Sequence, residues 1–87
     1  MSGYEKIIHK LLSGTSDTNF NFDELCSLLR RLNFNERIKG SHRIFYRQDI
    51  KEIINLQAVG SKAKAYQVKQ IRNIIVSYKL VQDENKI

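Results

Sequence analysis

The chain has 87 residues, a single cysteine and a formal net charge of +6 at neutral pH. This length corresponds to one domain. The lone cysteine, Cys26, excludes an internal disulfide, and two histidines beside it are too few for a four-ligand zinc site. The longest apolar runs have three residues, which excludes a membrane span, and no long apolar run follows the N-terminal charges as in a secretory signal. We therefore expect a cytoplasmic domain without a metal or other cofactor, with Cys26 buried on a helix.

The positive charge is concentrated in the second half of the chain. Residues 1–36 contain four Lys and Arg against five Asp and Glu, a net charge of −1. Residues 37–81 contain ten Lys and Arg against two Asp and Glu, a net charge of +8. A solvated basic face is one interpretation, but this concentration favours an anionic partner such as nucleic acid.

Two helices are predicted in the first third of the chain. The first extends over about residues 4–12, where apolar side chains recur at helical spacing, and the loop-forming residues 13–17 end it. The second begins after Asn21, which fits an N-cap with Glu24 as its capping-box partner. Asn33 fits the left-handed position that closes this helix.

Three strands and a closing helix are predicted for the rest of the chain. The strands extend over residues 34–39, 42–47 and 51–56, and the helix over residues 66–78. A three-stranded antiparallel sheet cannot bury one face alone, so the second and third helices should cover it. The order predicts an α+β fold, and residues 82–87 are expected to be frayed.

The faces of the second strand differ in composition but not decisively. Alternation along a strand separates two groups of three side chains. One group is His42, Ile44 and Tyr46, and the other is Arg43, Phe45 and Arg47. Because both groups contain apolar side chains, the pattern leaves open which face is buried.

The strongest chemical signal lies at the start of this strand. Gly40 and Ser41 make a turn, and His42 stands at its mouth. Metal-free cleavage of RNA needs a base for the 2′-hydroxyl, an acid for the 5′-oxygen and cations for the phosphate. Imidazole can serve as base or acid near neutral pH. An exposed turn histidine without function is the simpler alternative, and the second histidine, His9, fits a plain surface position. The cations available for the phosphate are Lys39, Arg43 and Lys62.

A further group of cations surrounds the start of the third helix. Lysines at a helix start oppose the helix dipole, whereas anions are attracted there. Contact with phosphate and ordinary solvation both account for such residues. The group comprises Lys62, Lys64, Lys69 and Arg72.

Three segments of the chain together resemble a known protein family. They are Leu32-Asn33-Phe34, Lys39-Gly40-Ser41-His42-Arg43-Ile44-Phe45 and Gln67-Val68-Lys69-Gln70-Ile71-Arg72-Asn73-Ile74-Ile75. In this order they are similar to the HicA (YcfA-like) toxin family. The resemblance covers residues 21–80 of the single domain 1–87, and residues 1–16 are a helical extension. It implies a double-stranded-RNA-binding-domain-like fold, with a three-stranded antiparallel sheet packed by two helices and an extra short N-terminal helix.

The resemblance also implies an activity. Family members are mRNA interferases, metal-independent endoribonucleases that act as toxins of type II toxin–antitoxin systems and arrest translation. A HicB-type antitoxin binds and masks the site, so the expected partners are messenger RNA and this antitoxin, and homodimer or heterocomplex stays open. His42 is then the catalytic residue. The residues expected to bind RNA are Lys39, Gly40, Ser41, Arg43, Lys62, Lys64 and Lys69.

The chain departs from the family pattern in two places. Many members have Gly-Phe where this chain has Asn33-Phe34. Many also have a proline and a second histidine after the third strand, whereas residues 55–59 read Asn-Leu-Gln-Ala-Val. Imidazole chemistry would therefore rest mainly on His42. A non-catalytic RNA-binding module and a protein-interaction domain with an acidic partner are the alternatives.

Overall fold

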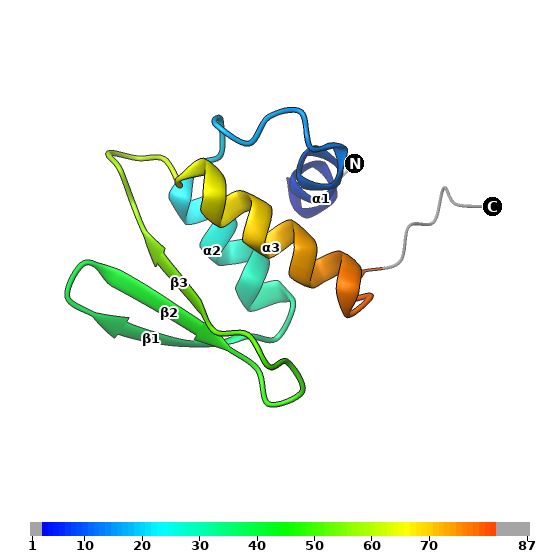
Figure 1. The fold of residues 1–87 in the computed structure, drawn as a ribbon. Helices are drawn as coiled ribbons and strands as arrows, with labels where there is room; N and C mark the ends of the chain where they lie inside the picture. Colours follow the sequence, from blue (N-terminus) through cyan, green and yellow to red (C-terminus); the bar gives the residue numbers. More distant parts are fainter. Residues whose placement is uncertain (1–2, 82–87) are drawn as a thin grey trace.

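The structure is a computed structural model that describes residues 3–81 (Figure 1). It has the α+β architecture that the sequence predicts, with three helices and one three-stranded antiparallel sheet. The fraying expected at residues 82–87 falls outside the described residues. In chain order the elements are α1 (Gly3–Ser13), α2 (Phe22–Arg31), β1 (Asn35–Lys39), β2 (His42–Tyr46), β3 (Ile54–Gln57) and α3 (Ala65–Ser77).

The sheet has the strand order β1-β2-β3, and both pairings are antiparallel. Gly40 lies in the turn between β1 and β2 with a φ of 61°, a left-handed conformation that glycine adopts without strain. Helices α2 and α3 lie together on one side of the sheet, as Figure 1 shows. The other side of the sheet is not covered by any element of residues 3–81, and we call it the open face.

The core settles which side of β2 is buried. Phe45 has no exposed surface and packs with Ile54 and Leu56 of β3 against the helices. Arg43 and Arg47 are each two positions from Phe45 and therefore lie on the same side of the sheet, the helix side. The helix residues that complete this core include Leu25, Leu29, Val68, Ile71 and Ile75.

The N-cap at Asn21 and the left-handed Asn33 match the sequence prediction for α2, while the reciprocal capping-box bond from Glu24 stays a prediction. The side chain of Asn21 accepts the backbone N–H groups of Asp23 and Glu24, at 2.9 and 3.2 Å, as an N-cap does. Asn33 has a φ of 68°, the left-handed conformation expected after the helix. These local signals therefore position α2 correctly before any tertiary contact is considered.

The third strand differs from its predicted range. It begins at Ile54 instead of residue 51 and ends at Gln57. The hydroxyl of Tyr78 accepts the backbone N–H of Lys51 at 3.3 Å and donates to the carboxylate of Glu52 at 2.6 Å. These contacts hold the segment against the end of α3, so it does not pair with β2.

Helix α1 is attached to α3 by one arginine. Arg72 makes two hydrogen bonds to the carboxylate of Asp17, at 2.7 and 3.0 Å, and one to the carbonyl oxygen of Leu11 at 3.2 Å. Leu11 is itself fully buried in the common core. Arg72, one of the cations considered for phosphate in the sequence, is therefore occupied with fixing α1.

Cys26 lies on the buried side of α2. Burial raises the pKa of its thiol to about 11, because a thiolate is poorly solvated in the core. The expectation of a buried, structural cysteine is confirmed. At neutral pH the group is a protonated, unreactive thiol.

Candidate active site on the open face of the sheet

The register of the strands places His42 in a row of three side chains. Residues directly opposite each other in an antiparallel pair project to the same face. His42 is opposite Lys39 of β1 and opposite Gln57 of β3. The amide of Gln57 also donates to the hydroxyl of Ser41 at 3.4 Å. The imidazole thus lies between a lysine and an amide, next to the Gly40–Ser41 turn.

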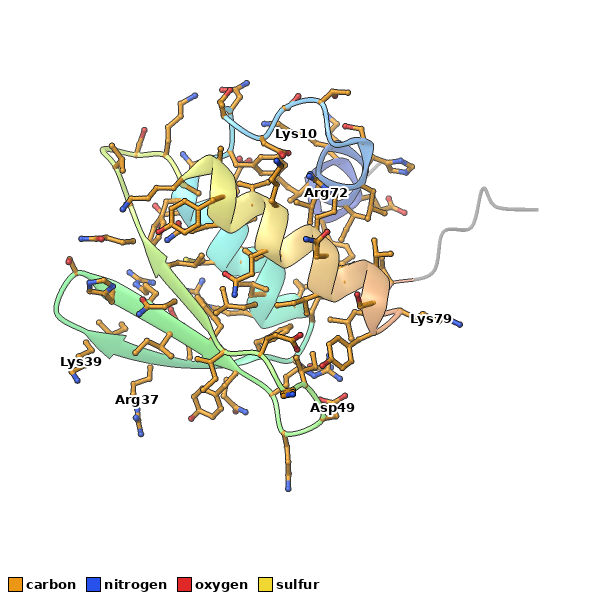
Figure 2. The ribbon with its side chains drawn as sticks, in the orientation of Figure 1. Lys10, Arg37, Lys39, Asp49, Arg72 and Lys79 are labelled. Atoms are coloured by element: carbon orange, nitrogen blue, oxygen red, sulfur yellow. The ribbon has the colours of Figure 1, made fainter. Side chains whose placement is uncertain are left out.

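Two further rows continue along the open face. In the second, Ile44 is opposite Arg37 and Asn55. In the third, Tyr46 is opposite Asn35. Figure 2 shows Lys39 and Arg37 pointing away from the helices, so their charges face solvent on the same side as the imidazole.

Asn55 fixes the orientation of the imidazole. Its side-chain oxygen lies 2.9 Å from Nδ1 of His42. An amide oxygen can only accept, so Nδ1 is the donor, and in the neutral ring the lone pair is on Nε2. The arrangement leaves Nε2 as the nitrogen that can take a proton from a substrate, which is the task of a general base.

Asn55 is in turn held by the start of α3. The side chain of Gln67, only 1% exposed, donates to the backbone oxygen of Asn55 at 3.1 Å. The side-chain oxygen of Gln67 accepts the backbone N–H of Lys64 at 3.4 Å. A buried amide therefore ties the beginning of α3 to the strand residue that orients His42.

Arg43 does not join His42, although the sequence analysis grouped them. It lies on the helix side of β2, where its guanidinium contacts the carboxylate of Glu36 at 3.0 Å. Arg30 of α2 binds the same carboxylate with two hydrogen bonds, at 2.8 and 2.9 Å. The bonds from Arg30 and Arg43 lower the pKa of Glu36. Alternation puts Arg43 and His42 on opposite faces of β2, as the sequence predicts, and burial of Phe45 places Arg43 on the helix side. A contact of Arg43 with RNA stays a prediction.

The lysines of the second basic group lie outside the three strands of the sheet. Lys62 contacts the side-chain oxygen of Asn19, in the segment before α2. Lys64 is the N-cap residue of α3, and its ammonium lies 5.9 Å from the ring centre of Tyr66. Lys69 is an exposed residue of α3. The structure therefore separates an open-face group, Lys39 and Arg37, from a group at the start of α3.

Two residues of this site were missed by the sequence analysis. Arg37 could have been found, because it precedes Lys39 by two positions and so shares its face. Asn55 could not be paired with His42, since the predicted third strand began three residues too early. His9, expected at a surface position, is exposed on α1.

The described residues were searched for a metal site and for a membrane-spanning helix. Within residues 3–81, no cluster of three or more His, Cys, Asp or Glu side chains is arranged to hold a metal ion. None of the three described helices has the length and apolarity needed to cross a membrane. An oriented imidazole opposite a lysine can, in chemical terms, transfer a proton next to a bound anion.

Comparison with known proteins gives no relative from which the role of His42 could be inferred. No protein-family model, curated protein or solved structure matches the chain. The similarity to the HicA family therefore rests on the three segments quoted from the sequence.

Proposed function

We propose that the protein is an endoribonuclease of the HicA type, a cytoplasmic toxin that cleaves messenger RNA and is inhibited by a HicB-type antitoxin. The observation that carries this proposal is the oriented imidazole of His42, bonded to Asn55 and placed opposite Lys39. The double-stranded-RNA-binding-domain-like arrangement is part of the same proposal. The order α2, β1, β2, β3, α3 is the order that the resemblance implies.

In the proposed reaction, Nε2 of His42 takes the proton of a ribose 2′-hydroxyl. The 2′-oxygen forms a bond to the adjacent phosphorus, and the bond from phosphorus to the 5′-oxygen of the next nucleotide breaks. The products are a 2′,3′-cyclic phosphate and a 5′-hydroxyl. The imidazolium that has formed is a proton donor for the departing 5′-oxygen. Lys39 lies across the strand pair, where its ammonium can stabilise the charge that develops on the phosphate.

Replacement of His42 tests this assignment. We expect His42→Ala to lower the rate of RNA cleavage by about 10²–10⁴-fold, the usual contribution of a positioned proton-transfer group. The rate is measured on a labelled messenger RNA with purified protein, and growth arrest is scored in cells. His9→Ala, an exposed histidine on α1, is the matched control and should leave both unchanged.

Equal cleavage by wild type and His42→Ala would contradict the proposal. Circular dichroism and thermal unfolding of the variant show whether the fold is retained. Binding of the protein encoded by a neighbouring reading frame, with loss of cleavage, is the expected behaviour of an antitoxin.

A non-catalytic RNA-binding module is the second candidate. It is favoured by the partial exposure of His42 and by the apolar side chains that share its face, since a sheet with exposed aromatic and basic residues can bind RNA without cutting it. Wild-type protein that binds RNA but never cleaves it would establish this candidate instead.

A further inference from the structure

The end of the open face farthest from the β1–β2 turn carries an apolar cluster that proton transfer does not use. Tyr46 is 39% exposed and Ile53 is 62% exposed. Ile53 directly precedes Ile54, the cross-strand partner of Phe45, so it enters the sheet at the same end at which Tyr46 leaves β2. Ile44, one row nearer to His42, is partly buried and continues the cluster. We call these three residues the Tyr46 patch.

The surroundings of the Tyr46 patch suit a polyanion with flat, apolar parts. Arg37 is opposite Ile44, and Asn35 is opposite Tyr46. The amide of Asn35 donates to the backbone oxygen of Tyr46 at 3.4 Å, which fixes this corner of the sheet. None of the paired strand residues on the open face is acidic. They are Asn35, Arg37, Lys39, His42, Ile44, Tyr46, Asn55 and Gln57.

The distance along β2 relates the patch to the imidazole. His42 and Tyr46 are four residues apart on one strand, which corresponds to about 13 Å. Stacked nucleotides of one strand rise by about 3.4 Å each, so a stacked chain bound from His42 to Tyr46 extends over about four nucleotides. A base on Tyr46 would therefore lie a few nucleotides from the phosphate at His42.

The exposed aromatic ring of the Tyr46 patch favours single-stranded over double-stranded RNA. In a duplex the flat faces of the bases are stacked inside the helix, whereas an unpaired strand can place a base on an aromatic ring. The cations in the two rows nearer the turn, Lys39 and Arg37, are placed for the backbone phosphates between the two ends. We propose that Tyr46, with Ile44 and Ile53, is a nucleobase-binding subsite for single-stranded RNA. The inference depends on the proposed function for its substrate, and it adds the single-stranded form and the position of the base.

Binding is measured in the His42→Ala background, so that RNA stays intact. A fluorescein-labelled single-stranded 12-mer is compared by anisotropy with the same sequence annealed into a duplex. Tyr46→Ala should weaken binding of the single strand by about 5- to 150-fold, the range found when a base-stacking aromatic is removed. Tyr46→Phe, which keeps the ring, should bind as the parent does. The matched control is Tyr66→Ala, because Tyr66 is 64% exposed on α3, away from the open face.

An abasic scan tests the same inference without changing Tyr46. Oligonucleotides with one abasic position each are bound to the parent protein, and one or two positions should show the same loss as Tyr46→Ala. At those positions the Tyr46→Ala variant should lose nothing further, since the base and the ring act as a pair. Uniform sensitivity along the strand would overturn the subsite.

The outcomes separate this inference from the proposed function. If wild type cleaves RNA but Tyr46→Ala binds as tightly as the parent, the subsite is wrong and the enzyme assignment stands. If wild type never cleaves but single-strand binding depends on Tyr46, the enzyme assignment is wrong and the subsite stands. Preference for the duplex, or a larger loss from Tyr66→Ala than from Tyr46→Ala, would place RNA on the helix side and overturn the subsite.

Discussion

The hydrogen bond between His42 and Asn55 is the smallest unit on which the proposed reaction depends. A histidine on a solvent-facing strand can turn about its side-chain bonds and exchange its ring proton between two nitrogens. The amide oxygen of Asn55, at 2.9 Å from Nδ1, restricts both. Since Gln67 binds the backbone and not the side chain of Asn55, that side chain can be changed while its attachment to α3 remains.

At the residue scale we expect Asn55→Ala to slow RNA cleavage by about 2- to 10-fold, the effect of losing one neutral hydrogen bond. The readout specific to orientation is ¹⁵N NMR of the imidazole, which should show the Nδ1–H tautomer in wild type and a mixture in the variant. Asn55→Asp restores an acceptor and adds a negative charge that favours the imidazolium, so the acidic limb of the pH–rate profile should move to higher pH.

Gln57→Ala is the matched control for this experiment. Gln57 lies opposite His42 on the same face, and its side chain makes a long hydrogen bond, 3.4 Å, to the hydroxyl of Ser41. Cleavage and tautomer should be unchanged in this variant. An Asn55→Ala protein with the wild-type tautomer and rate would contradict a positioning role for Asn55.

At the scale of the elements, the ion pair of Arg72 and Asp17 adds to the apolar packing that holds α1 on the folded unit. Both side chains are mostly buried, at 17% and 14% exposed. The hydrogen bonds that Arg72 donates lower the pKa of Asp17 from its ordinary value of 3.8. A carboxyl whose pKa is lowered by folding stabilises the folded state at pH values above its pKa in the unfolded chain. This contribution is lost as the pH falls through its pKa in the folded state.

We therefore expect Asp17→Asn to lower the free energy of unfolding by about 1–3 kcal/mol at neutral pH, as hydrogen bonds between charged groups contribute. The difference from wild type should shrink as the pH falls below 3.8, where the wild-type carboxyl is protonated in the unfolded chain and then in the folded one. Urea unfolding at several pH values measures both effects, and hydrogen exchange in α1 shows where the loss occurs.

The control pair is Arg47 with Asp49, whose carboxylate side chain is 63% exposed. Asp49→Asn should cost less than about 1 kcal/mol, because exposed ion pairs contribute little. Equal losses from Asp17→Asn and Asp49→Asn would show that burial of the Arg72 pair adds nothing.

The elements also show which parts of the fold follow from local sequence. The cap at Asn21 and the left-handed Asn33 depend on neighbouring residues alone, so α2 was predicted at both ends. The start of β3 depends on Tyr78, which is 27 positions from Lys51 in the chain, and no local pattern contains that contact.

The residues of the candidate site also differ in whether local sequence is enough to predict them. His42 was found because a Gly-Ser turn before a strand is a local signal. Alternation separates Arg43 from His42 in the sequence, but which of the two faces is buried is decided only when the helices cover Phe45. Asn55 was missed because its pairing with His42 depends on the register of β3.

At the scale of the whole molecule, two groups of basic residues are candidates for contact with RNA. Lys39 and Arg37 lie on the open face, and Lys62, Lys64 and Lys69 lie at or on α3. If RNA binds as proposed, a short single strand that follows β2 would contact the open face alone. The predicted contact of Lys62, Lys64 and Lys69 with RNA would then need an RNA long enough to extend beyond the open face.

This separation predicts a difference in salt dependence. For an RNA short enough to lie on the open face, Lys39→Ala should reduce the slope of log affinity against log salt by about 0.7, the value for one phosphate contact on a single strand. Lys69→Ala removes an equal charge from α3 and should leave the slope unchanged. Anisotropy titrations at four or five salt concentrations measure the slopes, and equal reductions would show that the RNA reaches both surfaces.

The single buried thiol of α2 gives the domain an internal reporter of its own opening. Cys26 is the only cysteine of the chain and has no exposed surface. A thiol reagent added to native protein can therefore react only during the brief openings that expose the core, and the labelling rate follows the free energy of those openings. Any ligand that binds the folded state slows such labelling. RNA or an antitoxin can thus be detected by its protection of one sulfur atom, with no dye attached and no residue of the open face altered.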